Sequence, residues 1–138
     1  MQSQIQRMKR RRFEQLIERA LDSLPEELQS LLDNVVIFIE DHPTPQTLRD
    51  MDVPRGDTLL GLYDGVPQTE RTSQYGLVPP DRITLFQHPI EESCNTEEEI
   101  PEQIRRTVLH EVAHHFGIDE ERMEEIEEGW DDRAEEER

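Results

Sequence analysis

Apolar residues recur at intervals of three and four positions near the start of the chain. This spacing predicts an amphipathic helix whose buried side chains are Phe13, Leu16, Ile17, Ala20, Leu21 and Leu24. The segment Ser23-Leu24-Pro25-Glu26 then has the composition of a capping box with a proline in the first turn. It predicts a second helix that ends near Asn34, so two short helices open the predicted fold.

Three later segments have the composition of β-strands. Residues 35–39 are apolar and mostly β-branched, and residues 35–40 are therefore predicted to form a strand buried on both faces or nearly so. Residues 59–63 predict a second strand, and residues 83–86 predict a last strand that Pro89 brings to an end. Between the first two, residues 41–58 contain prolines and a glycine but little periodicity, so we expect irregular chain there.

A turn is predicted after the second strand. Asp64-Gly65 is a dipeptide that favours a hairpin, and Val66-Pro67 follows it. Because proline has no N–H to donate to a ladder, this return is restricted to a sheet edge or a loop. Residues 69–82 are polar and predict a connection.

A further helix is predicted over residues 101–116. Pro101 suits its first turn, where the backbone N–H has no helical partner. The apolar positions form one broad stripe that we expect to face the core: Ile104, Val108, Leu109, Val112, Ala113 and Phe116. His110 and His114 lie away from this stripe, so they are expected to face a cleft.

The composition limits the chain to one compact domain. Of its 138 residues, 33% are hydrophobic and 35% are charged, which leaves little apolar material for a second core. The longest apolar run, residues 35–39, is far shorter than the ~20 residues that cross a bilayer, and no apolar segment follows the basic start. We therefore expect a cytoplasmic protein without a membrane partner. Cys94 is the single cysteine, so no internal disulfide can form.

Charge is unevenly distributed along the chain. Residues 1–12 hold five basic residues and no acid, whereas residues 119–138 hold 12 acidic and 3 basic residues, half of the net charge of −18. Because this net charge repels nucleic acid, we expect no nucleic-acid partner and interpret the basic run as a frayed helix start. The chain is then divided into a basic extension (1–12), one domain (13–130) and an acidic tail (131–138), with Trp130 packed back onto the domain.

The segment His110-Glu111-Val112-Ala113-His114 indicates a metal site. Residues i and i+4 of a helix share one face, so the two imidazoles can bind one zinc ion. Glu111 lies beside them, where a carboxylate can accept a proton from the attacking water in peptide hydrolysis. Gly117 tolerates the left-handed conformation that ends a helix, so the chain can reverse there and return an oxygen ligand from the acidic pair Asp119-Glu120.

Three other side chains are candidates to donate to the oxyanion or to orient the site: Tyr63, Tyr75 and His115. His115 lies five residues after His110 and therefore off the metal face. We expect it to be a partly buried histidine or a donor to a ligand. For Tyr63, simple packing on the sheet is the competing interpretation.

Three segments together resemble the bacterial minimal zincin-like metallopeptidases, a family long described as a domain of unknown function: residues 59–67, 80–86 and 110–117. The resemblance extends over about residues 13–130. It implies an α+β fold in which a small mixed or antiparallel sheet of three to four strands packs on the metal helix, with two N-terminal helices.

The resemblance also implies zinc bound by His110, His114 and an acidic residue after Gly117. Zincins place this third ligand ten residues after the first histidine, which here is Glu120. The family usually has aspartate at that position, and in this chain Asp119 lies one residue earlier, so Asp119 is the alternative third ligand.

We therefore expect a zinc metallopeptidase that acts on a peptide or protein substrate, with Glu111 as the general base. The alternative is a metal-stabilised protein-interaction module without peptidase activity, whose acidic surface recruits a basic partner. Structural zinc sites usually have four protein ligands, often cysteines, whereas this motif offers three and leaves one position open. That difference favours catalysis. The oligomeric state is left open.

Overall fold

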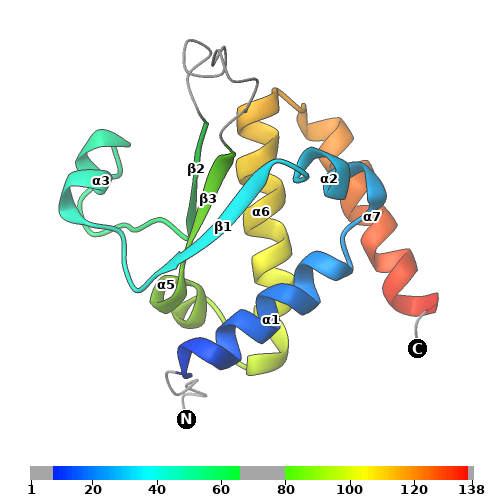
Figure 1. Ribbon diagram of the computed structural model, residues 1–138, viewed down its shortest axis with the longest axis horizontal. Coiled ribbons are helices and arrows are strands. Elements are labelled where there is room, and N and C mark those ends of the chain that lie inside the picture. Colours follow the sequence, from blue (N-terminus) through cyan, green and yellow to red (C-terminus); the bar gives the residue numbers. More distant parts are fainter. Residues whose placement is uncertain (1–7, 66–79, 137–138) are drawn as a thin grey trace.

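The computed structural model describes residues 8–65 and 80–136, and side chains as far as residue 128 (Figure 1). The described chain is α+β, which confirms the predicted class. Its elements in order are α1 (Arg10–Asp22), α2 (Glu26–Leu31), β1 (Val35–Glu40), α3 (Pro45–Asp50), β2 (Gly61–Asp64), β3 (Asp81–Phe86), α5 (Gln87–Glu92), the 3-10 helix η1 (Glu97–Glu99), α6 (Ile100–Phe116) and α7 (Glu120–Glu136).

The described strands form one three-stranded sheet in the order β1-β3-β2. β1 runs parallel to β3, with Ile37 opposite Ile83, and β2 runs antiparallel to β3, with Tyr63 opposite the same residue. The mixed sheet of the prediction is therefore confirmed. The strand that pairs with β2 is β3, and the predicted return at Val66-Pro67 lies outside the described residues.

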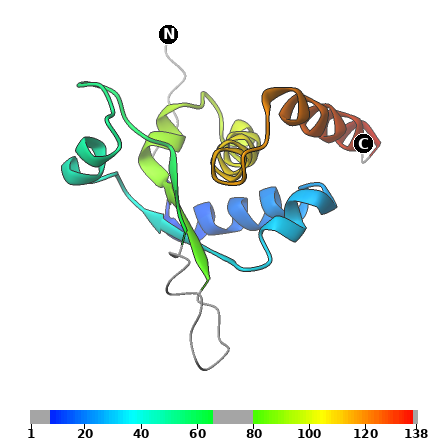
Figure 2. The same ribbon diagram turned by 90° about the horizontal axis from the view of Figure 1, so that it is seen from above.

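The core lies between the sheet and the two helices α1 and α6, which run side by side (Figure 2). The largest fully buried side chains come from all three parts: Phe13 and Leu16 of α1, Ile83 and Leu85 of β3, and Ile104 and Leu109 of α6. α7 follows α6 and lies on the far side of it from the sheet. The predicted apolar spacing of the first helix is thus confirmed as the packing face of α1.

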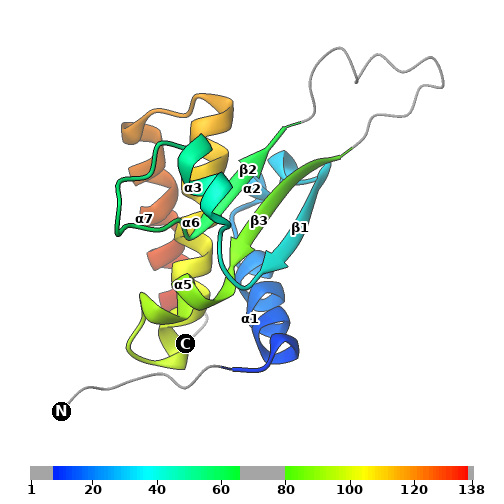
Figure 3. The ribbon, with the colours of Figure 1, turned by 90° about the vertical axis from the view of Figure 1, so that its left-hand side faces the viewer.

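The prediction that β1 is buried on both faces is wrong. Its residues alternate between half-buried and exposed, and Val36 and Phe38 are 40% and 48% exposed. The reason is the sheet order, because β1 is an edge strand (Figure 3) and the helices α1 and α6 cover only one face of the sheet. The apolar composition of the strand does not reveal which neighbours it lacks.

Two short helices occur where the sequence predicted none. α3 lies within residues 41–58, with Pro45 in its first turn and the Thr44 hydroxyl accepting the Thr47 N–H at 3.1 Å. α5 begins at Gln87 directly after β3, so Pro89 lies inside this helix instead of ending the strand. Six-residue helices contain too few turns to give a periodic apolar pattern.

The predicted capping box at the start of α2 is also wrong. Pro25 is the N-cap residue and makes no side-chain cap, while the Ser23 hydroxyl donates to the Ala20 carbonyl at 2.8 Å, at the end of α1. α2 ends at Leu31, three residues before the expected Asn34. A capping box does form at Thr96 and Glu99, which leads the chain into α6.

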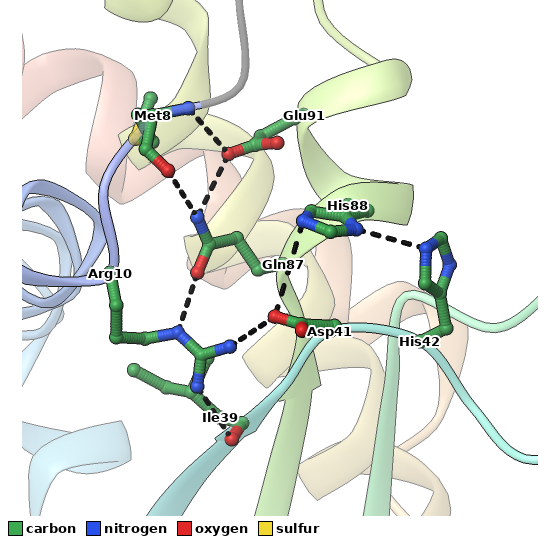
Figure 4. A network of polar contacts seen from close by, with 8 residues as sticks. All are labelled: Met8, Arg10, Ile39, Asp41, His42, Gln87, His88 and Glu91. Atoms are coloured by element: carbon green, nitrogen blue, oxygen red, sulfur yellow. Dashed lines mark hydrogen bonds and ion pairs between the residues drawn. The ribbon is translucent and has the colours of Figure 1, made fainter.

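Polar contacts join the start of α1 to the corner between β3 and α5 (Figure 4). The buried Gln87 side chain donates to the Met8 carbonyl at 2.9 Å and to Glu91 Oε2 at 3.0 Å, and it accepts from Arg10 Nε at 2.7 Å. His88 Nδ1 and His42 Nε2 lie 2.9 Å apart, at hydrogen-bond distance.

None of the described helices has the length and apolar character needed to cross a membrane.

Candidate metal centre

The helix α6 that carries the metal motif is formed as the sequence predicted. Pro101 lies in its first turn, and Gly117 ends it with a φ of 68°, a left-handed conformation that suits glycine. The predicted stripe is buried at Ile104, Val108, Leu109, Val112 and Ala113. Phe116 is the exception and is 45% exposed, because it is the last residue of the helix and contacts the rings of Tyr63 and His115 instead of the core.

His110, Glu111 and His114 line one cavity of about 500 Å³ beside α6. The rings of His110 and His114 face one another with their centroids 4.3 Å apart, and both side chains are open to solvent. Glu111 is half-buried. Helical spacing of four residues therefore brings the two histidines together, and Glu111 lines the same cavity from the position after His110.

The surroundings change the proton affinity of two of these groups. Burial raises the pKa of the Glu111 carboxyl; His114 opposes this rise and Asp64 adds to it. Burial, together with His114, lowers the pKa of the His110 imidazole. A neutral imidazole is the form that binds metal, and a carboxylate with a raised pKa is a better proton acceptor, so both shifts suit the expected roles.

The remaining walls of the cavity come from four places in the chain. The segment before β2 and its first residue contribute residues 58–61, α6 contributes the turn before His110, and α7 contributes Met123 and Glu127. Met51, after α3, completes the lining. The metal motif does not indicate these residues, although Met123 and Glu127 share a helical face with Glu120 at spacings of three and seven.

The two acids after Gly117 have different surroundings. Asp119 Oδ1 accepts the N–H of Arg122 at 2.8 Å and so caps the start of α7. Glu120 is the first residue of α7 and its side chain is exposed. Among the described residues, no three His, Cys, Asp or Glu side chains are arranged to hold one metal ion. The identity of the third ligand stays a prediction.

The two accessory candidates that the structure describes, Tyr63 and His115, lie outside this cavity lining. The Tyr63 hydroxyl donates to Asp81 Oδ2 at 2.6 Å, and its ring stacks on His115 with centroids 4.0 Å apart. His115 Nε2 lies 3.8 Å from the same carboxylate. These contacts attach the end of α6 to β2 and β3, and the His115 side chain is 36% exposed. Tyr75 and the side chain of Trp130 lie outside the described part of the chain.

A glycine sets the distance between β2 and α6 next to the cavity. A Cβ atom on Gly61 would lie 2.7 Å from Thr107 Cγ2 and 3.2 Å from the Thr84 carbonyl oxygen. With any larger residue at this position, the Thr107 side chain, the strand or the helix would have to shift. Gly61 and Thr107 both line the cavity.

The donor set fits zinc. Two imidazoles on one helix face, with carboxylates nearby and no cysteine in the cavity lining, are the ligand types of catalytic zinc sites. The cavity leaves room beside the histidines for a further group, which a closed structural site lacks.

Comparison with known proteins gives two similarities. The sequence profile of a family described as zincin-like metallopeptidase matches residues 32–130. A solved structure, a conserved hypothetical protein from Thermus thermophilus, is 26% identical with a TM-score of 0.51, over 79% of this chain and 94% of that chain. No curated protein matches the chain. The profile match includes every residue of the candidate centre.

Proposed function

Because the chain belongs to the zincin-like metallopeptidase family, we propose that it is a zinc-dependent peptidase that hydrolyses peptide bonds in a peptide or protein substrate. The observation that carries this proposal is that His110, Glu111 and His114 line one open cavity. The single cysteine supports a cytoplasmic setting, since it allows no internal disulfide.

His110 and His114 hold the zinc through imidazole nitrogens in this proposal. Glu120 is the proposed third ligand, and the alternative is Asp119. Glu120 is favoured because one oxygen of Asp119 already accepts the Arg122 N–H. When bound, zinc supplies a Lewis acid that polarises the scissile carbonyl and lowers the pKa of a water toward ~7.

Glu111 is the proposed general base. It accepts a proton from the attacking water as the C–O bond forms, and it returns that proton to the amide nitrogen as the C–N bond breaks. Its half-buried position and raised pKa support this role. A general base both accepts and returns a proton most effectively when its pKa lies close to the pH at which the enzyme works, and a raised carboxyl pKa is closer to neutral pH.

The lining of the cavity indicates the type of side chain that the substrate carries near the cleaved bond. Met51, Leu59, Leu60 and Met123 present apolar surface, and Arg106 and Glu127 add one charge of each sign. Pockets of this kind bury an apolar group and use a few polar groups to orient it. We therefore propose cleavage next to an apolar residue.

The competing function is an interaction module in which the zinc only stabilises the fold. That function predicts a closed set of four protein ligands around the metal. The open cavity beside His110 and His114 supports the peptidase instead. Both functions predict zinc binding, so they differ in their dependence on Glu111.

The test is digestion of a peptide library by the zinc-loaded protein, read by mass spectrometry. Glu111→Gln is expected to keep its zinc and to lose activity by at least ~100-fold, because an amide of the same shape cannot accept the proton. Glu98→Gln, at an exposed position on η1, is the matched control and is expected to cleave like the wild type. Wild-type activity in Glu111→Gln would contradict the assignment of Glu111 as the general base. A zinc-loaded wild-type protein that cleaves no peptide would favour the interaction module.

A further inference from the structure

The outer edge of β1 carries backbone groups that the sheet does not use. The Asp81 N–H donates to the Asn34 carbonyl at 3.0 Å. In the parallel pair of β1 and β3, this bond determines which residues of β1 direct their backbone groups toward β3 and which direct them outward. Even-numbered residues of β1 then face β3, and Val35, Ile37 and Ile39 direct their N–H and C=O groups outward. Figure 3 shows β1 at the margin of the sheet.

At both ends of this edge an outward backbone group already has a hydrogen-bond partner, whereas the middle of the edge has none in the described chain. The Val35 N–H donates to the Leu32 carbonyl at 3.0 Å, and Arg10 Nη1 donates to the Ile39 carbonyl at 3.0 Å (Figure 4). Ile37 lies between them, and within residues 8–65 and 80–136 its outward N–H and C=O have no partner. The open stretch therefore offers one complete pair of ladder bonds, centred on Ile37.

A groove runs beside this edge, between β1 and α1. It has a volume of about 440 Å³, and we call it the α1–β1 groove. Its apolar lining comes from Ile17 and Leu21 of α1 and from Ile37, Phe38 and Ile39 of β1. An extended chain added to β1 would direct every second side chain into this groove, because alternate residues of a strand point to the same face.

The α1 side of the groove is acidic. Glu14 and Glu18 lie one helical turn apart in its lining, and neither has an ion-pair partner in the described chain. The basic residue of the groove, Arg10, is already paired with Asp41. Together with the net charge of −18, this disfavours a second copy of the chain as the occupant and favours a basic one.

We propose that the α1–β1 groove binds an extended, basic segment of a partner protein, which adds as an antiparallel strand to β1. The partner residue opposite Ile37 is apolar, exchanges both backbone hydrogen bonds and enters the groove. Lysine or arginine two residues to either side points to the same face, where Glu14 and Glu18 lie. This mode combines main-chain affinity with side-chain specificity, and it is independent of the proposed peptidase activity.

The probe is a fluorescein-labelled peptide, Thr-Lys-Thr-Val-Thr-Lys-Thr, and the readout is fluorescence anisotropy with the full chain. N-methylation of the central valine is expected to weaken binding by about tenfold, since it removes a ladder hydrogen bond. N-methylation of a neighbouring threonine is expected to leave binding unchanged, because that N–H points away from β1. Equal affinity of the two methylated peptides would overturn strand addition, as would absence of binding by the parent peptide.

A charge-reversal pair tests the acidic side of the groove. Glu14→Lys with Glu18→Lys is expected to weaken binding by about tenfold or more, because both attractions become repulsions. Glu26→Lys with Asp33→Lys makes the same change of net charge at exposed positions around α2 and is expected to bind like the wild type. Equal losses in the two variants would show general charge attraction only. A dimer in sedimentation equilibrium that the peptide dissociates would instead assign the groove to a second copy.

Discussion

Asp119 and Glu120 are neighbours with the same charge, yet the structure separates their roles. Asp119 caps α7 through the Arg122 N–H, whereas Glu120 begins the helix with an exposed side chain. Removal of a capping aspartate typically costs about 1 kcal/mol of stability. Removal of a metal ligand instead weakens the binding of zinc. The two alanine variants should therefore fail in different ways.

We predict that Asp119→Ala lowers the free energy of unfolding by about 1 kcal/mol and keeps its zinc. Glu120→Ala is predicted to keep its stability as apoprotein and to bind zinc at least ~10-fold more weakly. Urea unfolding of the apoproteins and chelator competition at one pH measure the two effects. Loss of zinc in Asp119→Ala with zinc retained in Glu120→Ala would make Asp119 the ligand.

At the residue scale, helical spacing was enough to predict that His110, Glu111 and His114 lie together, because their proximity is local to one helix. Glu127 and Met123 were missed because their place in the cavity depends on how α7 packs beside α6. The Tyr63–Asp81–His115 contacts were missed for the same reason, since they join two strands and a helix.

At the scale of elements, the approach of β2 to α6 depends on the absence of a side chain at Gly61. Gly61→Ala is predicted to destabilise the fold by about 1–3 kcal/mol, because its Cβ would overlap Thr107 Cγ2 and approach the Thr84 carbonyl. Thr107→Ser removes the methyl group that Cβ would meet. Thermal unfolding of both single variants and the double variant gives the coupling between the two positions.

In the double variant, Gly61→Ala is predicted to cost less than it does alone. Equal costs in the two backgrounds would show that the pair does not set the distance between strand and helix. The Thr84 carbonyl remains in place in both backgrounds, so partial recovery is the expected result.

The elements differ in how far the sequence could predict them. The positions of β1, β2 and β3 follow from local apolar composition, and α6 follows from its long periodic stripe. α3 and α5 were missed because six residues give little periodicity. The exposed face of β1 could not be predicted, because it results from the position of that strand at the edge of the sheet.

At the scale of the whole molecule, zinc is expected to stabilise the folded chain, since the two histidines come together only when α6 is formed. At a zinc concentration 100 times the Kd, mass action contributes ~2.7 kcal/mol. Zinc is therefore predicted to raise the melting temperature of the wild type by several degrees. The same rise should be absent in His110→Ala and in His114→Ala.

His115→Ala is the matched control for this experiment. It removes a histidine from the same helix but outside the cavity lining, so its melting temperature falls through lost stacking on Tyr63. Its zinc-dependent rise is predicted to persist. A rise that disappears in His115→Ala and remains in His114→Ala would move the metal site to another part of the helix.

The α+β class and the helix that carries the His110–His114 motif could be predicted for the whole molecule, but the strand order could not. The pairing of β1 with β3 joins residues more than forty positions apart, such as Val35 with Asp81, and no local pattern encodes which strands meet. That pairing places β1 beside α1 and β2 beside α6. The strand order therefore decides which strand contacts α6 and leaves the edge of β1 open beside the α1–β1 groove.

The zinc content of the purified chain tests the central claim most directly. Mass spectrometry of the metal is predicted to find about one zinc per chain in the wild type and in Glu111→Gln, and none in the double variant His110→Ala with His114→Ala. A wild-type chain without stoichiometric metal, or a double variant with unchanged zinc, would contradict the account.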